Sequence, residues 1–142
     1  MPHLTIEYSA NLDGRVEMSR LCRLLRDEIL ATRLFEMGAV RVRTVRCEAF
    51  AVADMLPANA FIDMSFRIRA GRSARDKKAV GDQIFSAAST FLSELLAEAH
   101  FALSLEMREI DPELSWKKNA MHARLRGGGD ATMQAAQEPS NV

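Results

Sequence analysis

The sequence predicts an α+β protein made of two tandem strand–helix–strand units, because the same pattern of residues occurs twice. Each half begins with alternating apolar and polar residues, passes through a turn, and continues with apolar residues at three- and four-residue spacing. We expect one domain over residues 1–125, with units at about 1–55 and 58–125, in which a four-stranded mixed sheet carries two helices on one face. Residues 126–142 include a run of glycines and a polar, alanine- and glutamine-rich stretch, which predicts a disordered tail.

The overall composition fits a single soluble domain. The chain has 142 residues, of which 48% are hydrophobic and 27% charged, and its 19 basic residues balance 19 acidic ones. This balance argues against a nucleic-acid-binding protein, and no apolar run is long enough to cross a membrane. The N-terminus lacks the features of a signal peptide, so we expect a cytoplasmic protein in which Cys22 and Cys47 are reduced. The spacing of the histidines predicts no metal site, and we expect no cofactor.

The first unit is predicted to begin with a strand over residues 2–9, in which the even-numbered residues from Leu4 onward are apolar. The turn that follows contains Asn11 and Asp13, and we expect one of them to cap the next helix. Apolar residues at helical spacing then predict a helix over residues 16–32.

A long second strand is predicted over residues 40–52. Its alternation slips by one residue at Thr44 and Val45, which predicts a bulge or bend near Arg43. Residues 54–59 contain a proline and are expected to form the loop between the two units.

The second unit repeats this order. A strand over residues 62–69 is followed by a turn at residues 70–72. Ser73 and Asp76 are close to a capping box, which predicts the start of a helix that runs to about Ala97.

The predicted sheet has one uncovered face. After a last strand over residues 101–108, only an irregular or weakly helical arm over residues 116–125 remains. No helix is therefore left for the face that carries Thr5, Ser65 and Ser104. We expect two sheets to pack face to face in an oligomer.

Pro2 is the first candidate for catalysis. If Met1 is removed, the nitrogen of Pro2 becomes a secondary amine, a base that no side chain supplies, at the rigid start of a strand. An ordinary α-amino group titrates at about 7.7–8.0, and an apolar pocket with arginines nearby would lower that pKa. The alternative is that Pro2 merely begins a strand, where its missing N–H costs nothing.

Arg41, Arg43 and Arg72 are candidates for binding an anion. Arg41 and Arg43 are two residues apart and share a face of their strand if the predicted bend lies beyond them. Arg72 lies in the turn before a helix, whose N-terminus also attracts anions. Arginine side chains bind carboxylates through two parallel hydrogen bonds. The alternative is that all three are solvated surface charges.

Four short motifs, weak individually, together resemble a known family. They are Met-Pro-His-Leu-Thr-Ile-Glu-Tyr-Ser at the start, Val-Arg-Val-Arg at 40–43, Ala-Gly-Arg-Ser at 70–73, and Trp-Lys-Lys-Asn-Ala-Met-His-Ala at 116–123. In this order, over residues 2–125, they resemble the tautomerase superfamily, and within it the 5-carboxymethyl-2-hydroxymuconate isomerases.

The resemblance implies a cofactor-independent keto–enol tautomerase. Its reaction would convert 5-carboxymethyl-2-hydroxymuconate to the 2-oxo isomer in homoprotocatechuate (4-hydroxyphenylacetate) degradation. Pro2 would be the general base, Arg41 and Arg72 would be catalytic, and both would bind a dicarboxylate or tricarboxylate substrate together with Arg43. The resemblance also implies a homotrimer, and a site divided between the halves, with Pro2 and Arg41 in the first and Arg72 in the second.

Three alternatives remain open at this point. The chain could be a tautomerase of another 2-hydroxydienoate, a non-catalytic oligomeric module that binds a carboxylate, or a structural assembly protein. Retention of Met1 would favour binding, because the nitrogen of Pro2 would then be an amide. The wall of the pocket is not assigned by any motif, and Phe50, Val52 and Trp116 are the residues we consider for it.

Overall fold

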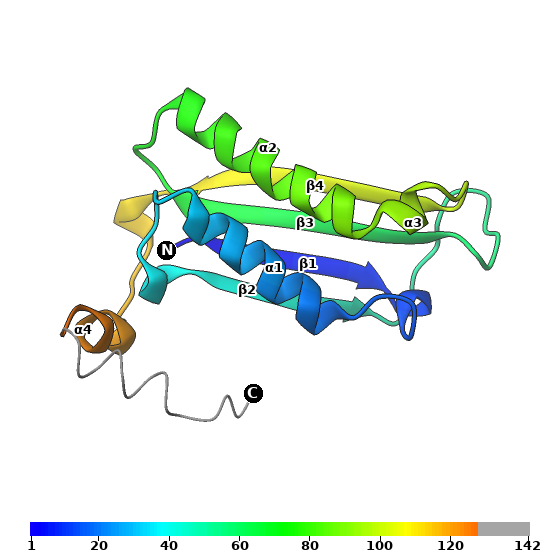
Figure 1. Ribbon diagram of the computed structural model, residues 1–142, viewed down its shortest axis with the longest axis horizontal. Coiled ribbons are helices and arrows are strands. Elements are labelled where there is room, and N and C mark those ends of the chain that lie inside the picture. The colour runs from blue at the N-terminus through cyan, green and yellow to red at the C-terminus, as the bar shows by residue number, and fades with distance from the viewer. Residues whose placement is uncertain (128–142) are drawn as a thin grey trace.

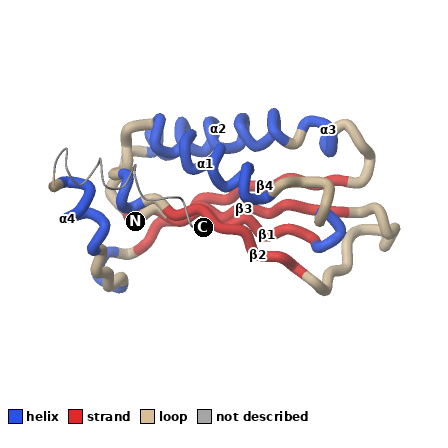
Figure 2. The backbone as a smooth tube through the Cα atoms, turned by 60° about the horizontal axis from the view of Figure 1, so that its bottom comes forward, coloured by secondary structure: helices blue, strands red, loops and turns tan. Residues whose placement is uncertain are grey.

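A four-stranded sheet forms the base of the fold, and two long helices lie side by side on one of its faces (Figures 1 and 2). The computed structural model describes residues 1–127 of the chain. The strands are β1 (His3–Ser9), β2 (Arg41–Cys47), β3 (Ala60–Arg69) and β4 (Phe101–Ile110). The long helices are α1 (Met18–Ala31) and α2 (Ala74–Phe91), and the short ones are α3 (Ser93–Leu96) and α4 (Ala120–Arg126). Three single turns of 3₁₀-helix complete the list: η1 (Ala10–Leu12), η2 (Met37–Ala39) and η3 (Pro112–Leu114).

The predicted mixed sheet and its two strand–helix–strand units are confirmed. The strand order is β2-β1-β3-β4, with β1 parallel to β2, β3 parallel to β4, and β1 antiparallel to β3. A long helix connects the strands of each parallel pair, as parallel neighbours require. The two units meet where β1 pairs with β3, so one continuous sheet runs through both halves.

The alternation along β1 and β3 decides which face of the sheet the helices cover. Even-numbered residues of both strands are buried, among them Leu4, Ile6, Ile62, Met64 and Phe66. They pack against residues at helical spacing on α1 (Leu21, Leu25, Ile29) and on α2 (Val80, Ile84, Ala88). Apart from that of Ala88, each of these side chains contributes roughly 1.5–3 kcal/mol when it is fully buried. The core therefore lies between the sheet and the layer of helices, and Figure 2 shows these two layers.

β2 is shorter and more regular than predicted. It ends at Cys47, and its register with β1 is unbroken along the whole strand, so the bulge predicted near Arg43 is absent. The apparent slip arises because Val45 is an apolar residue on the uncovered face, where its side chain is 45% exposed. Beyond Cys47 the chain folds into the loop between the units, where the Asn59 side chain donates a hydrogen bond to the Val52 carbonyl oxygen (3.1 Å).

Two helix predictions also need correction. Neither Asn11 nor Asp13 caps α1, which begins after Glu17 without a hydrogen bond from a capping side chain. Asn11 instead donates its side-chain N–H to the backbone oxygen of Asn59 (2.7 Å), which ties the first turn to the loop between the units. The predicted second helix is interrupted at Leu92, after which the chain resumes as α3.

The second face of the sheet has no helix over it in the part of the chain that the structure describes. Thr5 and Ser65 are half-buried there and Ser104 is exposed. The same face carries charged residues, and the Ser104 hydroxyl donates a hydrogen bond to Asp63 (2.7 Å). Packing of this face against another copy of the chain stays a prediction.

The remaining expectations concern the thiols and the C-terminal arm. Cys22 and Cys47 are both free and partly buried. The predicted arm contains α4, which ends at Arg126, and residues 128–142, most of the predicted tail, lie outside the described residues. Among the helices within residues 1–127, none has the length and apolar character that a membrane crossing requires.

The capping box predicted for α2 can be tested by a matched pair of variants. The Ser73 hydroxyl accepts a hydrogen bond from the backbone N–H of Asp76 (3.0 Å). We expect Ser73→Ala to lower the free energy of unfolding by about 1 kcal/mol, because that N–H loses its acceptor. Ser93→Ala removes an exposed hydroxyl that makes no cap bond in α3, and should change stability by less than about 0.5 kcal/mol. Urea unfolding at one fixed protein concentration measures both, and equal losses would contradict the cap.

Candidate active site

The start of the chain is built into the sheet. β1 begins at His3, and the carbonyl oxygen of the preceding residue, Pro2, accepts a hydrogen bond from the backbone N–H of Arg41 (3.1 Å). Pro2 is buried. Because this bond extends the β1–β2 pairing by one residue, Pro2 is held at a defined place at the end of the sheet. The pocket that Pro2 lines is also lined by His122 and Arg126 of α4.

A pocket of about 400 Å³ opens beside Pro2. Segments that are far apart in the sequence meet there: the chain start, the loop after α1, the end of β3, the turn before α2 and the C-terminal arm. Its lining includes Phe35, Glu36, Arg69, Arg72, Lys117 and His122. The volume lies within the range of about 300–1,000 Å³ that is usual for small-molecule sites.

Arg72 is held in this pocket by the loop after α1. One of its guanidinium nitrogens donates a hydrogen bond to the carbonyl oxygen of Leu34 (2.7 Å), and the guanidinium carbon lies 4.3 Å from the centre of the Phe35 ring. Phe35 in turn packs edge-on against the buried Phe66, with ring centres 5.9 Å apart. The core thus positions the aromatic ring, and the ring positions the cation. The other guanidinium N–H groups have no hydrogen-bond partner among the described residues and are available to an anion.

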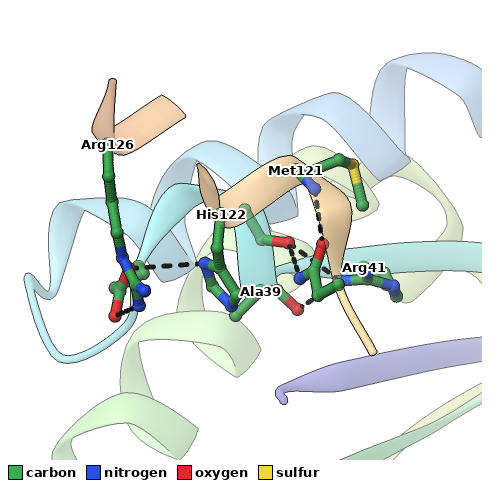
Figure 3. Close-up of polar contacts among 8 residues, drawn as sticks. Ala39, Arg41, Met121, His122 and Arg126 are labelled. Atoms are coloured by element: carbon green, nitrogen blue, oxygen red, sulfur yellow. Dashed lines mark hydrogen bonds and ion pairs between the residues drawn. The ribbon is translucent and has the colours of Figure 1, made fainter. Parts of the chain in front are cut away.

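Arg41 and Arg43 are placed differently from Arg72. The guanidinium of Arg41 donates hydrogen bonds to the carbonyl oxygens of Gly38 (3.1 Å) and Ala39 (2.8 Å), which places it beside η2 and outside the pocket lining (Figure 3). Arg43 lies on the uncovered face of the sheet, where its side chain reaches His3 (3.4 Å). Of the residues predicted for the site, the structure therefore brings Pro2 and Arg72 together, with Arg41 alongside and Arg43 elsewhere.

The pocket is electropositive at the chain terminus. The pKa of the terminal ammonium, carried by Met1, is lowered by burial first, and then by the positive charges of Lys117, Arg72, Arg69 and Arg41. Both causes disfavour the charged ammonium. On lowering the pH, this amine therefore stays neutral down to a lower pH than a fully exposed terminal amine would. Removal of Met1 would leave the amine of Pro2 in this same electropositive surrounding.

His3, the next residue along β1, is also kept neutral. Burial, followed by the charges of Arg67 and Arg43, lowers the pKa of His3 to about 4. At pH 7 its imidazole therefore carries no charge, and Arg43 donates to its Nδ1 atom. His3 adds no positive charge to the site.

The C-terminal arm is fastened beside the pocket by a cluster of contacts, drawn in Figure 3. Arg126 donates two hydrogen bonds to Glu36 (2.5 and 2.8 Å), and Nδ1 of His122 lies 3.3 Å from the same carboxylate. The Asn119 side chain donates to the carbonyl oxygen of Gly38 (2.8 Å). Gly38 itself is buried against α4 and has no room for a larger residue. The arm is thus attached to the segment that leads into β2.

Sequence reasoning missed several pocket residues. Phe35 gave no signal, because a loop phenylalanine has no periodic pattern around it. Arg69 is the last residue of a strand with alternating apolar and polar residues, where a charged side chain is expected simply to be exposed to solvent. Lys117 belongs to one of the motifs that carried the resemblance, but its spacing indicates no function. Only the meeting of the loops places these residues beside Pro2.

A larger and more open groove of about 780 Å³ lies between α2 and β4. Two of its charged residues, Lys77 and Glu109, are already paired with each other (2.6 Å). It contains neither the chain terminus nor any predicted site residue. Within residues 1–127, no three side chains of His, Cys, Asp or Glu gather closely enough to hold a metal ion. The pocket at Pro2 is therefore the candidate active site.

Comparisons with known proteins show the family of the chain. The sequence model of the 5-carboxymethyl-2-hydroxymuconate isomerase family matches residues 2–125. A curated relative, the 5-carboxymethyl-2-hydroxymuconate Delta-isomerase of Escherichia coli, is 29% identical over 126 residues, which cover 89% of this chain and 100% of the relative.

Solved structures of related proteins match most of the chain. A 5-carboxymethyl-2-hydroxymuconate isomerase from Deinococcus radiodurans has a TM-score of 0.83 and 36% identity, over 88% of this chain and 94% of its own. A native fused 4-OT shares the fold, with a TM-score of 0.64 and 17% identity over 84% of this chain and 97% of its own. Another fused 4-OT, described as an asymmetric trimer, has a TM-score of 0.60 and 15% identity over 83% and 97% of the two chains.

The attachment of the C-terminal arm can be tested at Gly38. A methyl group there would lie 3.0 Å from Nδ1 of His122 and 3.3 Å from its backbone nitrogen, so α4 or its side chains have to move by a few tenths of an ångström. We expect Gly38→Ala to cost about 1–3 kcal/mol of stability and to speed hydrogen exchange in α4. Gly81→Ala is the matched control, because its methyl would meet Met107 at an ordinary 3.6 Å and should stabilise α2 by up to about 1 kcal/mol. Unchanged exchange in α4 of Gly38→Ala would show that the close contact does not fix the arm.

Proposed function

The chain belongs to the 5-carboxymethyl-2-hydroxymuconate isomerase family and is an isomerase of the tautomerase superfamily, and from that premise we propose its reaction. The protein converts 5-carboxymethyl-2-hydroxymuconate to its 2-oxo isomer, in homoprotocatechuate degradation, without a cofactor and with Pro2 as general base. The observation that carries the proposal is the position of Pro2, which lines one pocket together with Arg72 and two further cations that have no acidic partner among the described residues, Arg69 and Lys117.

The proposed reaction moves a proton within one molecule. After removal of Met1, the neutral amine of Pro2 takes the proton of the 2-hydroxyl group, and a dienolate forms. The resulting ammonium returns a proton to carbon, so that a carbonyl group and a C–H bond replace the enol. A base acts best when its pKa lies near the working pH, and the lowered pKa of the terminal amine supports this role.

Arg72 is the residue best placed to stabilise the dienolate. Its guanidinium is fixed by Leu34 and Phe35, and its free N–H groups are available to an oxyanion or a carboxylate. Fixed donors of this kind stabilise charge that develops in the transition state. Arg41 contributes positive charge near the amine and orders η2 through its hydrogen bonds to Gly38 and Ala39. Arg43 would reach a substrate only across the uncovered face of the sheet.

We also propose that the chain acts as a homotrimer in the cytoplasm. The uncovered face of the sheet, with Val45 partly exposed on it, is suited to packing against another copy. Near the arm, Leu114 is 70% and Trp116 is 86% exposed, which leaves large apolar side chains for a partner to cover. The trimer described for a fused 4-OT of the same fold supports this assembly.

The role of Pro2 can be tested by Pro2→Ala, with Pro57→Ala in the exposed loop between the units as the matched control. We expect Pro2→Ala to lower kcat/KM by about 10²–10⁴-fold, the usual contribution of a positioned base, and Pro57→Ala to leave it unchanged. The measurement is ultraviolet-monitored ketonisation of 5-carboxymethyl-2-hydroxymuconate. Intact-mass analysis of each purified protein shows whether Met1 has been removed.

Full activity in a protein that retains Met1 would rule out the proline mechanism. A protein that acts only on another 2-hydroxydienoate would show that the proposed substrate is wrong.

The charge of Arg72 predicts a shift in the pH profile. The base form of the amine is active, so kcat/KM should rise with pH through the pKa of the Pro2 amine. We expect the surroundings that lower the pKa of the Met1 ammonium to lower this pKa as well. Arg72→Gln removes a positive charge that disfavours the ammonium, so the pKa of the amine rises and the acid limb moves to higher pH. The profile of kcat/KM against pH measures this shift. An acid limb that stays in place, or moves to lower pH, would contradict the assignment of the amine as the titrating base.

A further inference from the structure

Two cations of the pocket have no role in the proposed reaction so far. Arg69 is the last residue of β3 and Lys117 lies in the arm before α4, and both line the pocket with Pro2 and Arg72. Neither forms an ion pair with an acid in the described part of the chain, whereas Arg126 in the same lining is neutralised by Glu36.

The charge balance of the lining is therefore strongly positive. Arg69, Arg72 and Lys117 have no acidic partner among the described residues, and the carboxylate of Glu36 is engaged by Arg126 and His122. Cations gathered without acids repel one another and attract anions. Their influence reaches the reacting end of the pocket, because Lys117 and Arg69 both disfavour the charged form of the terminal ammonium.

The two cations differ from Arg72 in how they are held. Arg72 is fixed by a hydrogen bond and by stacking, which suits it to one defined acceptor. Arg69 and Lys117 are exposed at the rim of the pocket, and their positions come from the end of β3 and from the arm anchored at Asn119. A lysine is a mobile point charge that follows its acceptor, whereas an arginine offers a planar fork.

We propose that Arg69 and Lys117 form a second carboxylate subsite, separate from Arg72, which makes this pocket select substrates with more than one carboxylate. The inference rests on the proposed function for the reaction, but it assigns the selectivity to two residues outside the predicted catalytic set. Arg72 acts on the reacting part of the substrate, and Arg69 with Lys117 binds a carboxylate farther along its chain. These are binding and specificity residues, and no proton passes through them.

Arg69→Gln, Lys117→Gln and the double variant test the subsite kinetically. We expect each single variant to raise KM for 5-carboxymethyl-2-hydroxymuconate about tenfold or more, since a hydrogen bond to a charged group is lost. For 2-hydroxypentadienoate, which carries one carboxylate, KM should change less than twofold. Lys118→Gln and Arg124→Gln remove the same charge from the same arm outside the pocket lining, and should leave both substrates unaffected. An equal rise in KM for both substrates would contradict the proposed subsite.

A binding measurement separates this inference from the proposed reaction. Calorimetry with tricarballylate, an unreactive tricarboxylate, and with butyrate does not depend on turnover. We expect the double variant to lose at least tenfold in affinity for tricarballylate and nothing for butyrate. If the wild-type protein binds tricarballylate at least tenfold more tightly than the double variant but does not turn over the muconate, the proposed reaction fails and the subsite stands. If the wild-type protein is active and the double variant keeps its selectivity and its tricarballylate affinity, the subsite is wrong and the reaction stands.

Discussion

The backbone hydrogen bond between Pro2 and Arg41 is the constraint on which the site depends. The first residues of a chain are usually poorly ordered, but here the β1–β2 pairing extends to residue 2 and buries Pro2. A base at the end of a frayed segment would lose its geometry and with it much of its catalytic advantage. Because Pro2 continues β1, an interior strand that pairs with β2 on one side and with β3 on the other, the terminus is held by the sheet.

The positive charge of the pocket has two physical consequences that reinforce each other. The cations attract carboxylates. Burial first, and then these cations, lower the pKa of the terminal ammonium, as the proposed role of the amine as a base requires. A neutral pocket could hold the same amine but would leave it protonated to higher pH. The arrangement costs repulsion in the empty protein, and a bound polyanion offsets that repulsion. The ring of Phe35 helps to hold the guanidinium of Arg72 in place despite the repulsion from the other cations.

The C-terminal arm depends on close packing more than on its ion pairs. The ion pair of Glu36 with Arg126 and the contact of Glu36 with His122 lie at the surface, where solvent screens charges and such pairs contribute little to stability. The contact of α4 with Gly38 and the hydrogen bond from Asn119 place the arm more specifically.

The sequence alone determined the two strand–helix–strand units, because alternation and helical spacing report which side chains are buried, and its motifs pointed to Pro2 and Arg72. It misjudged β2, since Val45 is apolar on a face that the single chain does not cover. Only the tertiary structure placed Phe35 and Lys117 beside Pro2. Periodicity describes each element by itself, whereas a pocket forms where the ends of several elements meet, and that meeting is set by the packing of the sheet and helices.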